Sequence, residues 1–130
     1  MSRRYVLGID IGGTNVVAGC VSEDGSALHG LRSEPTVAEK GADDVIERIL
    51  RLAHAAMEET RAVDRLAEIV GVGIGAPGPL DTRRGIVLLT PNLGGRNMPL
   101  RDRVGGPLGL PAALDNDANC AALGEWWMGA

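Results

Sequence analysis

A chain of 130 residues is long enough for one domain with a hydrophobic core and too short for two ordinary domains. Apolar residues make up 45% of the chain and charged residues 23%, a composition that excludes wholesale disorder. The net charge of −4 argues against a nucleic-acid surface, and no apolar run approaches the roughly 20 residues of a membrane-spanning helix.

The cysteine and glycine contents add two expectations. Cys20 and Cys120 are far apart and form no CxxC spacing, so they fit a reducing cytoplasm better than a disulfide framework or a metal site. The first apolar stretch is interrupted by Asp10, which is unlike a signal peptide. The 19 glycines, about twice the usual share of roughly 7%, indicate tight turns or backbone that lies close to a ligand.

The first part of the chain predicts three strands that pair as an antiparallel meander. Two turn signals separate them, the paired glycines Gly12 and Gly13 and an acidic turn that ends in Gly25. The strands are expected at residues 5–9, 15–21 and 27–32.

From residue 43 to residue 59 the period becomes helical, because apolar side chains recur every three or four residues. Asp43 and Asp44 lie in the first turn, where a negative charge favours the positive end of the helix dipole. The expected apolar face consists of Val45, Ile46, Ile49, Leu50, Ala53, Ala56 and Met57.

The second half predicts shorter elements between glycines and prolines. A short helix is expected from Leu100 to about Val104, stopped by Gly105, Gly106 and Pro107. Strands are expected at 69–74, 86–89 and 111–115, and a last helix at 116–128. A meander followed by crossover helices implies an α/β fold, in which helices cover a mixed sheet and ligands bind outside the strand ends.

Two common phosphate-binding motifs are excluded. The Walker A motif requires Gly-Lys-Ser/Thr, and the only lysine of the chain is Lys40, in the sequence Glu-Lys-Gly. Residues 73–78 match G-x-G-x-x-G literally. The dinucleotide fingerprint, however, requires a helix to begin within the motif, and polar turn residues follow Pro77 and Pro79 instead.

Residues 10–14, Asp-Ile-Gly-Gly-Thr, suit a phosphate loop better. Two glycines and a hydroxyl after a strand can hold phosphate oxygens through backbone N–H groups, while Asp10 orients Mg²⁺ through its waters. An ordinary hairpin with an aspartate before its turn is the alternative interpretation. These five residues alone support both equally.

Acid and amide side chains gather where the last predicted strand gives way to the last helix, at Asp115, Asn116, Asp117 and Asn119. A carboxylate there can accept a proton from a substrate hydroxyl, and asparagines can hold several hydroxyls. A helix-capping cluster is the alternative, since Asp and Asn are preferred N-cap residues. Some residues of the cluster can bind or activate a substrate while others cap the helix.

Four segments occur in order along nearly the whole chain, at residues 10–14, 73–79, 91–93 and 116–119. Together they resemble the N-terminal half of the ROK family (repressors, open reading frames and kinases), and within it the bacterial glucokinases. The resemblance implies an actin-like ATPase fold, with an RNase H-like sheet in each of two domains and the active site between them. Residues 1–130 then form the N-terminal domain.

The resemblance also implies roles in phosphoryl transfer. Asp10, Gly12, Gly13 and Thr14 match the loop that holds the phosphates of ATP, with Mg²⁺ bound to Asp10 through water. Asp117 matches the catalytic base that takes the proton from the sugar hydroxyl. Its neighbour Asp115 could face the same way, but only Asp117 follows the asparagine of the motif.

The sugar site follows from the same resemblance. Asn92 and Asn116 match residues that hydrogen-bond sugar hydroxyls together with Asp117, and the backbone at Gly75, Ala76, Pro77 and Gly78 lines the sugar pocket. Gly95 departs from the pattern, because the family often has an aromatic residue there. We expect the zinc motif, the adenine pocket and the surface that forms a homo-oligomer in the second domain, and no zinc site in residues 1–130.

The leading hypothesis is the N-terminal lobe of an ATP-dependent kinase of a hexose, glucose above all, that transfers phosphate to the 6-hydroxyl. We expect the 130-residue chain alone to be inactive, because half of the ATP site is missing. A sugar-sensing regulator of the same family is an alternative, but its helix-turn-helix precedes the phosphate loop, and Asp10 leaves no room for one. A non-catalytic sugar-binding module is the third hypothesis.

Overall fold

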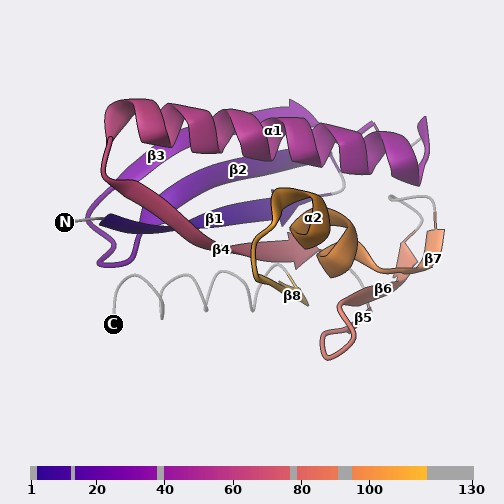
Figure 1. Ribbon diagram of the computed structural model, residues 1–130. Coiled ribbons are helices and arrows are strands. Elements are labelled where there is room, and N and C mark those ends of the chain that lie inside the picture. The colour runs from indigo at the N-terminus through magenta and orange to yellow at the C-terminus, as the bar shows by residue number, and fades with distance from the viewer. Residues whose placement is uncertain (1–2, 13, 38–39, 77–78, 91–94, 117–130) are drawn as a thin grey trace.

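The computed structural model describes residues 3–12, 14–37, 40–76, 79–90 and 95–116 (Figure 1). A five-stranded mixed sheet carries the long helix α1 on one face, and a three-stranded sheet lies beside it. The elements are β1 (Arg3–Ile11), β2 (Asn15–Ser22), β3 (Leu28–Pro35), α1 (Ala42–Val63), β4 (Ala67–Ala76), β5 (Leu80–Asp81), β6 (Ile86–Thr90), β7 (Gly95–Met98), α2 (Leu100–Leu108) and β8 (Ala112–Asn116).

The large sheet has the strand order β3-β2-β1-β4-β8. The pairs β1–β2 and β2–β3 are antiparallel, which confirms the predicted meander. The pairs β1–β4 and β4–β8 are parallel, so the chain crosses over through α1 and later through α2. The predicted mixed sheet with crossover helices is therefore correct. The short strands β5 and β7, which flank β6 in the second sheet, were not predicted.

The core lies between the large sheet and the two helices. Alternate residues of β1 are buried on the helix side, while Gly8 and Asp10 are exposed on the opposite side. Helix α1 is longer than predicted and packs an apolar face on the sheet. Within it Leu52 is buried and Leu50 is only partly covered, the reverse of the expectation. The buried residues of α1 are Val45, Ile46, Ile49, Leu52, Ala53, Ala56, Met57 and Thr60.

Helix α2 runs through the residues that were expected to stop it. Pro107 lies inside its last turn, and the helix ends at Gly109, which adopts a left-handed φ of 67°. Gly105 serves close packing rather than termination, because a Cβ there would come within 2.8 Å of the Cβ of Ala112 in β8. The prediction of a helix end at Gly105 was wrong because the glycine lets α2 approach the sheet.

The turn from α1 into β4 is held by Asp64, the C-cap of α1. Its carboxylate accepts hydrogen bonds from the hydroxyl of the buried Tyr5 at 2.9 Å and from the N–H of Leu66 at 3.0 Å, and it pairs with Arg3 at 3.3 Å. The Tyr5 hydroxyl, more than any other group, holds the pKa of Asp64 below its usual range.

Removal of that hydroxyl tests the role of the turn. We expect Tyr5→Phe to lower the free energy of unfolding by about 1 kcal/mol near neutral pH, as measured by urea denaturation. A lowered pKa means that the stabilisation is present above the ordinary pKa of Asp64 and is lost as the pH falls through the lowered one. The difference in the free energy of unfolding between the wild type and Tyr5→Phe should therefore become smaller in acid. Arg3→Gln, at an exposed partner, should change stability much less.

Candidate functional site

The parallel strands β1, β4 and β8 bring three predicted site segments to one edge of the sheet. Asp10 near the end of β1 pairs with Gly75 in β4, and Gly75 pairs with Asp115 in β8. Because residues in register share a face of a parallel sheet, both aspartates lie on the side opposite α1. Gly75 presents no side chain between them, and two strand spacings put their Cα atoms about 10 Å apart.

The next pair along the same edge is Ala76 with Asn116, the last residue of β8. The sheet thus brings the strand ends that carry the predicted sugar-site segments beside the strand that carries Asp10. Five predicted site residues lie outside the described residues: Gly13, Pro77, Gly78, Asn92 and Asp117.

The predicted phosphate loop closes the hairpin between β1 and β2. The N–H of Gly12 donates to the carbonyl oxygen of Asn15 at 2.8 Å, just beyond the last strand pair, Ile11 with Val16. This confirms the hairpin. A Cβ on Gly12 would lie 3.0 Å from the same oxygen, so close approach rather than a left-handed φ favours glycine here. Thr14, on the other side of position 13, is exposed.

Thr36, directly after β3, contacts the predicted phosphate loop, and the sequence reasoning missed it. It is fully buried (0% exposed). Its Oγ1 donates to the carbonyl oxygen of Gly12 at 3.0 Å, and its N–H donates to the carbonyl oxygen of Thr14 at 2.8 Å. The meander itself was the available signal, since it returns the end of β3 to the β1–β2 hairpin.

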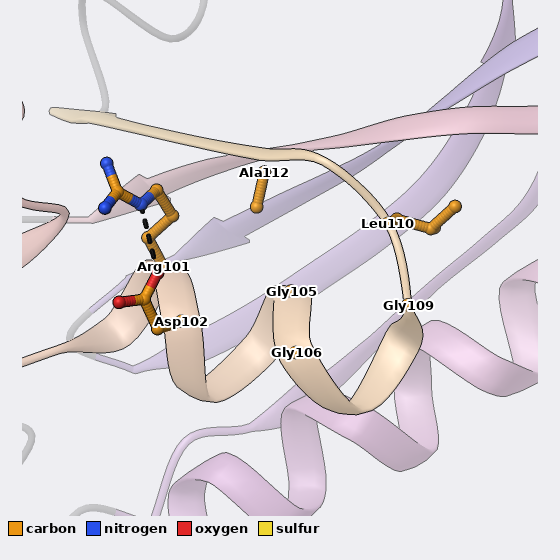
Figure 2. A pocket seen from close by; sticks show the side chains of 7 residues that line it. All are labelled: Arg101, Asp102, Gly105, Gly106, Gly109, Leu110 and Ala112. Atoms are coloured by element: carbon orange, nitrogen blue, oxygen red, sulfur yellow. Dashed lines mark hydrogen bonds and ion pairs between the residues drawn. The ribbon is translucent and has the colours of Figure 1, made fainter.

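A separate hollow of about 360 Å³ lies between α2 and β8 (Figure 2). Its two charged side chains, Arg101 and Asp102, pair with each other at 3.2 Å, and most of the remaining lining is glycine and backbone. None of the described residues of the candidate site lines it. The hollow is lined by Arg101, Asp102, Gly105, Gly106, Gly109, Leu110 and Ala112.

No three His, Cys, Asp or Glu side chains of the described residues gather closely enough to hold a metal ion by themselves. Mg²⁺ needs fewer protein ligands, because it is commonly bound by one or two carboxylates together with substrate phosphates. The exposed Asp10 at the strand end fits that mode. No helix among the described residues combines the length and apolar character that a membrane crossing requires.

Comparison with known proteins gives a consistent family. The model of the ROK family matches residues 6–130. The glucokinase of Thermotoga maritima is 40% identical over 131 residues, which cover 100% of this chain and 39% of that protein. The ROK glucokinase of Streptomyces griseus, solved with glucose and AMPPNP, superposes with a TM-score of 0.79 at 36% identity, over 97% of this chain and 37% of that one.

A repressor is also similar in sequence to this chain. The xylose repressor of Caldicellulosiruptor bescii is 44% identical over 85 residues, which cover 64% of this chain and 21% of that protein. The chain spans less than two fifths of the length of the glucokinases it matches. The likeness to ROK sugar kinases of known structure confirms the predicted actin-like fold.

Proposed function

Because this chain belongs to the ROK family, we propose that it forms the N-terminal lobe of an ATP-dependent hexose kinase acting on the 6-hydroxyl of glucose. The observation that carries the proposal is the row of Asp10, Gly75 and Asp115 at one sheet edge, with Ala76 and Asn116 in the next pair. This edge joins the proposed phosphate loop to the proposed sugar segments. The glucokinase of S. griseus was solved with glucose and with AMPPNP, an analogue of ATP, which supports glucose and ATP as the ligands.

Asp117, the residue after the end of β8, is the proposed general base. It takes the proton of the 6-hydroxyl while that oxygen bonds to the γ-phosphorus and the bond from phosphorus to the β–γ bridging oxygen breaks. Asn92 and Asn116 hold sugar hydroxyls, and the backbone of residues 75–78 lines the sugar pocket. Transfer then depends mainly on positioning, which fixed strand ends supply.

The loop of residues 10–14 is the proposed phosphate site. The Gly12 N–H is already bonded to Asn15, so we assign Gly12 to the shape of the hairpin and the phosphate contacts to Gly13 and Thr14. Asp10 would hold Mg²⁺ through water, and the ion, when bound, neutralises charge on the phosphate oxygens. We propose turnover for the full-length protein, since closure of two domains completes such sites.

A sugar-sensing regulator is the second candidate, favoured by the similarity to the C. bescii repressor. A regulator of this kind binds sugar and DNA without transferring phosphate. The full-length protein therefore separates the two candidates: glucose-dependent ADP formation supports the kinase, and sugar-dependent DNA binding without ADP formation supports the regulator.

The phosphate role of the loop is tested by Gly13→Val in the full-length protein. A Cβ at this position would crowd the incoming phosphate oxygens, so we expect ATP affinity to fall at least about tenfold, with glucose affinity unchanged. Calorimetric titration of each ligand into the folded variant measures both. Gly25→Val, in the β2–β3 turn with a φ of 75°, is the control and should lose stability without losing either ligand. Unaltered ATP binding in Gly13→Val would remove the phosphate role from the loop.

A further inference from the structure

The two hydrogen bonds of Thr36 fix the direction of two loop peptide groups. One bonded carbonyl belongs to Gly12 and the other to Thr14, so the bonds fall on either side of position 13. In a trans peptide group the N–H points opposite to the C=O. The carbonyl groups of Gly12 and Thr14 are therefore both held toward Thr36, and the N–H of Asn15, which shares its peptide unit with the Thr14 carbonyl, points away from it.

Loop carbonyls that are held toward a buried residue suit an anion site. Successive N–H groups that point to one side make a concavity that attracts phosphate, while a carbonyl oxygen turned to that side would repel it. Thr36 is fully buried, and both its N–H and its hydroxyl donate hydrogen bonds to loop carbonyls. It is therefore built into the fold as a fixed support, on the side of the loop away from the ligand.

The backbone beyond Thr36 gives independent support. Val37 adopts a φ of 51°, a left-handed conformation that a β-branched residue rarely takes. Conformations of this kind persist only where the surroundings over-determine them, and they cluster at functional sites. Here the left-handed residue directly follows the residue whose two donors face the loop.

We infer that Thr36 is a positioning residue for ATP, which holds the loop of residues 10–14 in the shape that receives the phosphates. This rests on the proposed phosphate role of the loop. The hydroxyl acts through the Gly12 carbonyl and does not touch the nucleotide. Its loss should therefore affect ATP affinity selectively, and glucose affinity should stay constant because Asn92, Asn116 and Asp117 contact the sugar.

The test is Thr36→Val in the full-length protein, which keeps the shape of the side chain and removes the hydroxyl. We expect the dissociation constant for ATP, measured by calorimetry, to rise about tenfold, and that for glucose to stay within about twofold. Hydrogen exchange of the amides of residues 10–16 should accelerate in the same variant without ligand. If Thr36→Val does not fold, Thr36→Ala removes the same hydroxyl without placing a new methyl beside the Gly12 carbonyl.

Two further variants separate positioning from plain stability. Thr36→Ser restores the hydroxyl and should return the ATP dissociation constant to within about threefold of the wild type. Thr60→Val is a matched control: Thr60 is equally buried (0% exposed), and its Oγ1 donates to a backbone carbonyl, that of Ala56, at 2.7 Å. It should lower the melting temperature and leave ATP binding unchanged.

The outcomes are distinct. If the wild type binds ATP and Thr36→Val binds it equally well, or if Thr60→Val weakens ATP as much as Thr36→Val does, the inference is wrong and the proposed function stands. If the wild type binds glucose but no ATP, the proposed function itself is wrong. Selective loss of ATP in Thr36→Val, with rescue by Thr36→Ser, supports both.

Discussion

Asp117→Asn in the full-length protein is expected to lower kcat for glucose phosphorylation by roughly 10² to 10⁴ while the protein folds normally. Asparagine preserves the volume of the side chain and its ability to cap a helix, but it cannot accept the proton of the attacking hydroxyl. A coupled assay of ADP formation, with glucose affinity measured separately by calorimetry, distinguishes lost chemistry from lost binding.

Asp115→Asn is the matched control for this variant. Asp115 lies within β8 in register with Gly75, one row before the pair of Ala76 with Asn116. We expect kcat to change by less than about tenfold. Equal losses in the two variants, or an inactive Asp115→Asn beside an active Asp117→Asn, would contradict the assignment of the base.

Gly30→Ala is expected to destabilise the fold by about 3–5 kcal/mol. Gly30 lies in β3 where the register with β2 shifts, and it has a φ of 70°. A Cβ there would clash with the carbonyl oxygen of Ala56 in α1 and lie 2.8 Å from the Cα of the same residue. These are backbone atoms, so no side-chain rotation relieves the contact and α1 must move off the sheet.

Gly109→Ala isolates the contribution of that contact. Gly109 has nearly the same φ, 67°, and no atom within 4 Å of the place where its Cβ would be. Backbone strain alone should lower stability by about 1 kcal/mol in this variant. Urea denaturation of both variants gives the difference. Similar losses for the two would mean that β3 and α1 are not in tight contact at Gly30.

The sequence predicted those parts of the fold that depend on local periodicity. The alternation along β1 and the apolar face of α1 are properties of neighbouring residues, and both are present in the structure. The predicted end of α2 was wrong because glycine and proline normally break helices, whereas Gly105 lies inside α2 and allows β8 to pack closely against it. Leu52 was missed because the packing of α1 against the sheet, not the periodicity, decides the edge of its buried face.

The candidate site also has residues that the sequence predicted and one that it did not. The predicted strands placed Asp10 and Gly75 at strand ends and Asn116 at the start of the last helix. In the structure Asn116 is the last residue of β8, and the parallel register brings the three positions together. Thr36 could not be found by spacing, because its hydroxyl bonds to Gly12 across 24 residues of sequence. Hydrogen bonds between distant backbone segments leave no periodic trace.

The strand order has a consequence for the synthesis of the protein. The meander β1–β2–β3 pairs neighbours in sequence, so it can form as soon as it leaves the ribosome, whereas β1 must wait for β4, and β4 for β8. Until β8 is made, one side of β4 stays unpaired, and an unpaired strand edge invites association with other chains. The strand that carries Asp115 and Asn116 thus also covers the open edge of β4, so the pairing that lines these residues up with Gly75 and Ala76 removes that edge during synthesis.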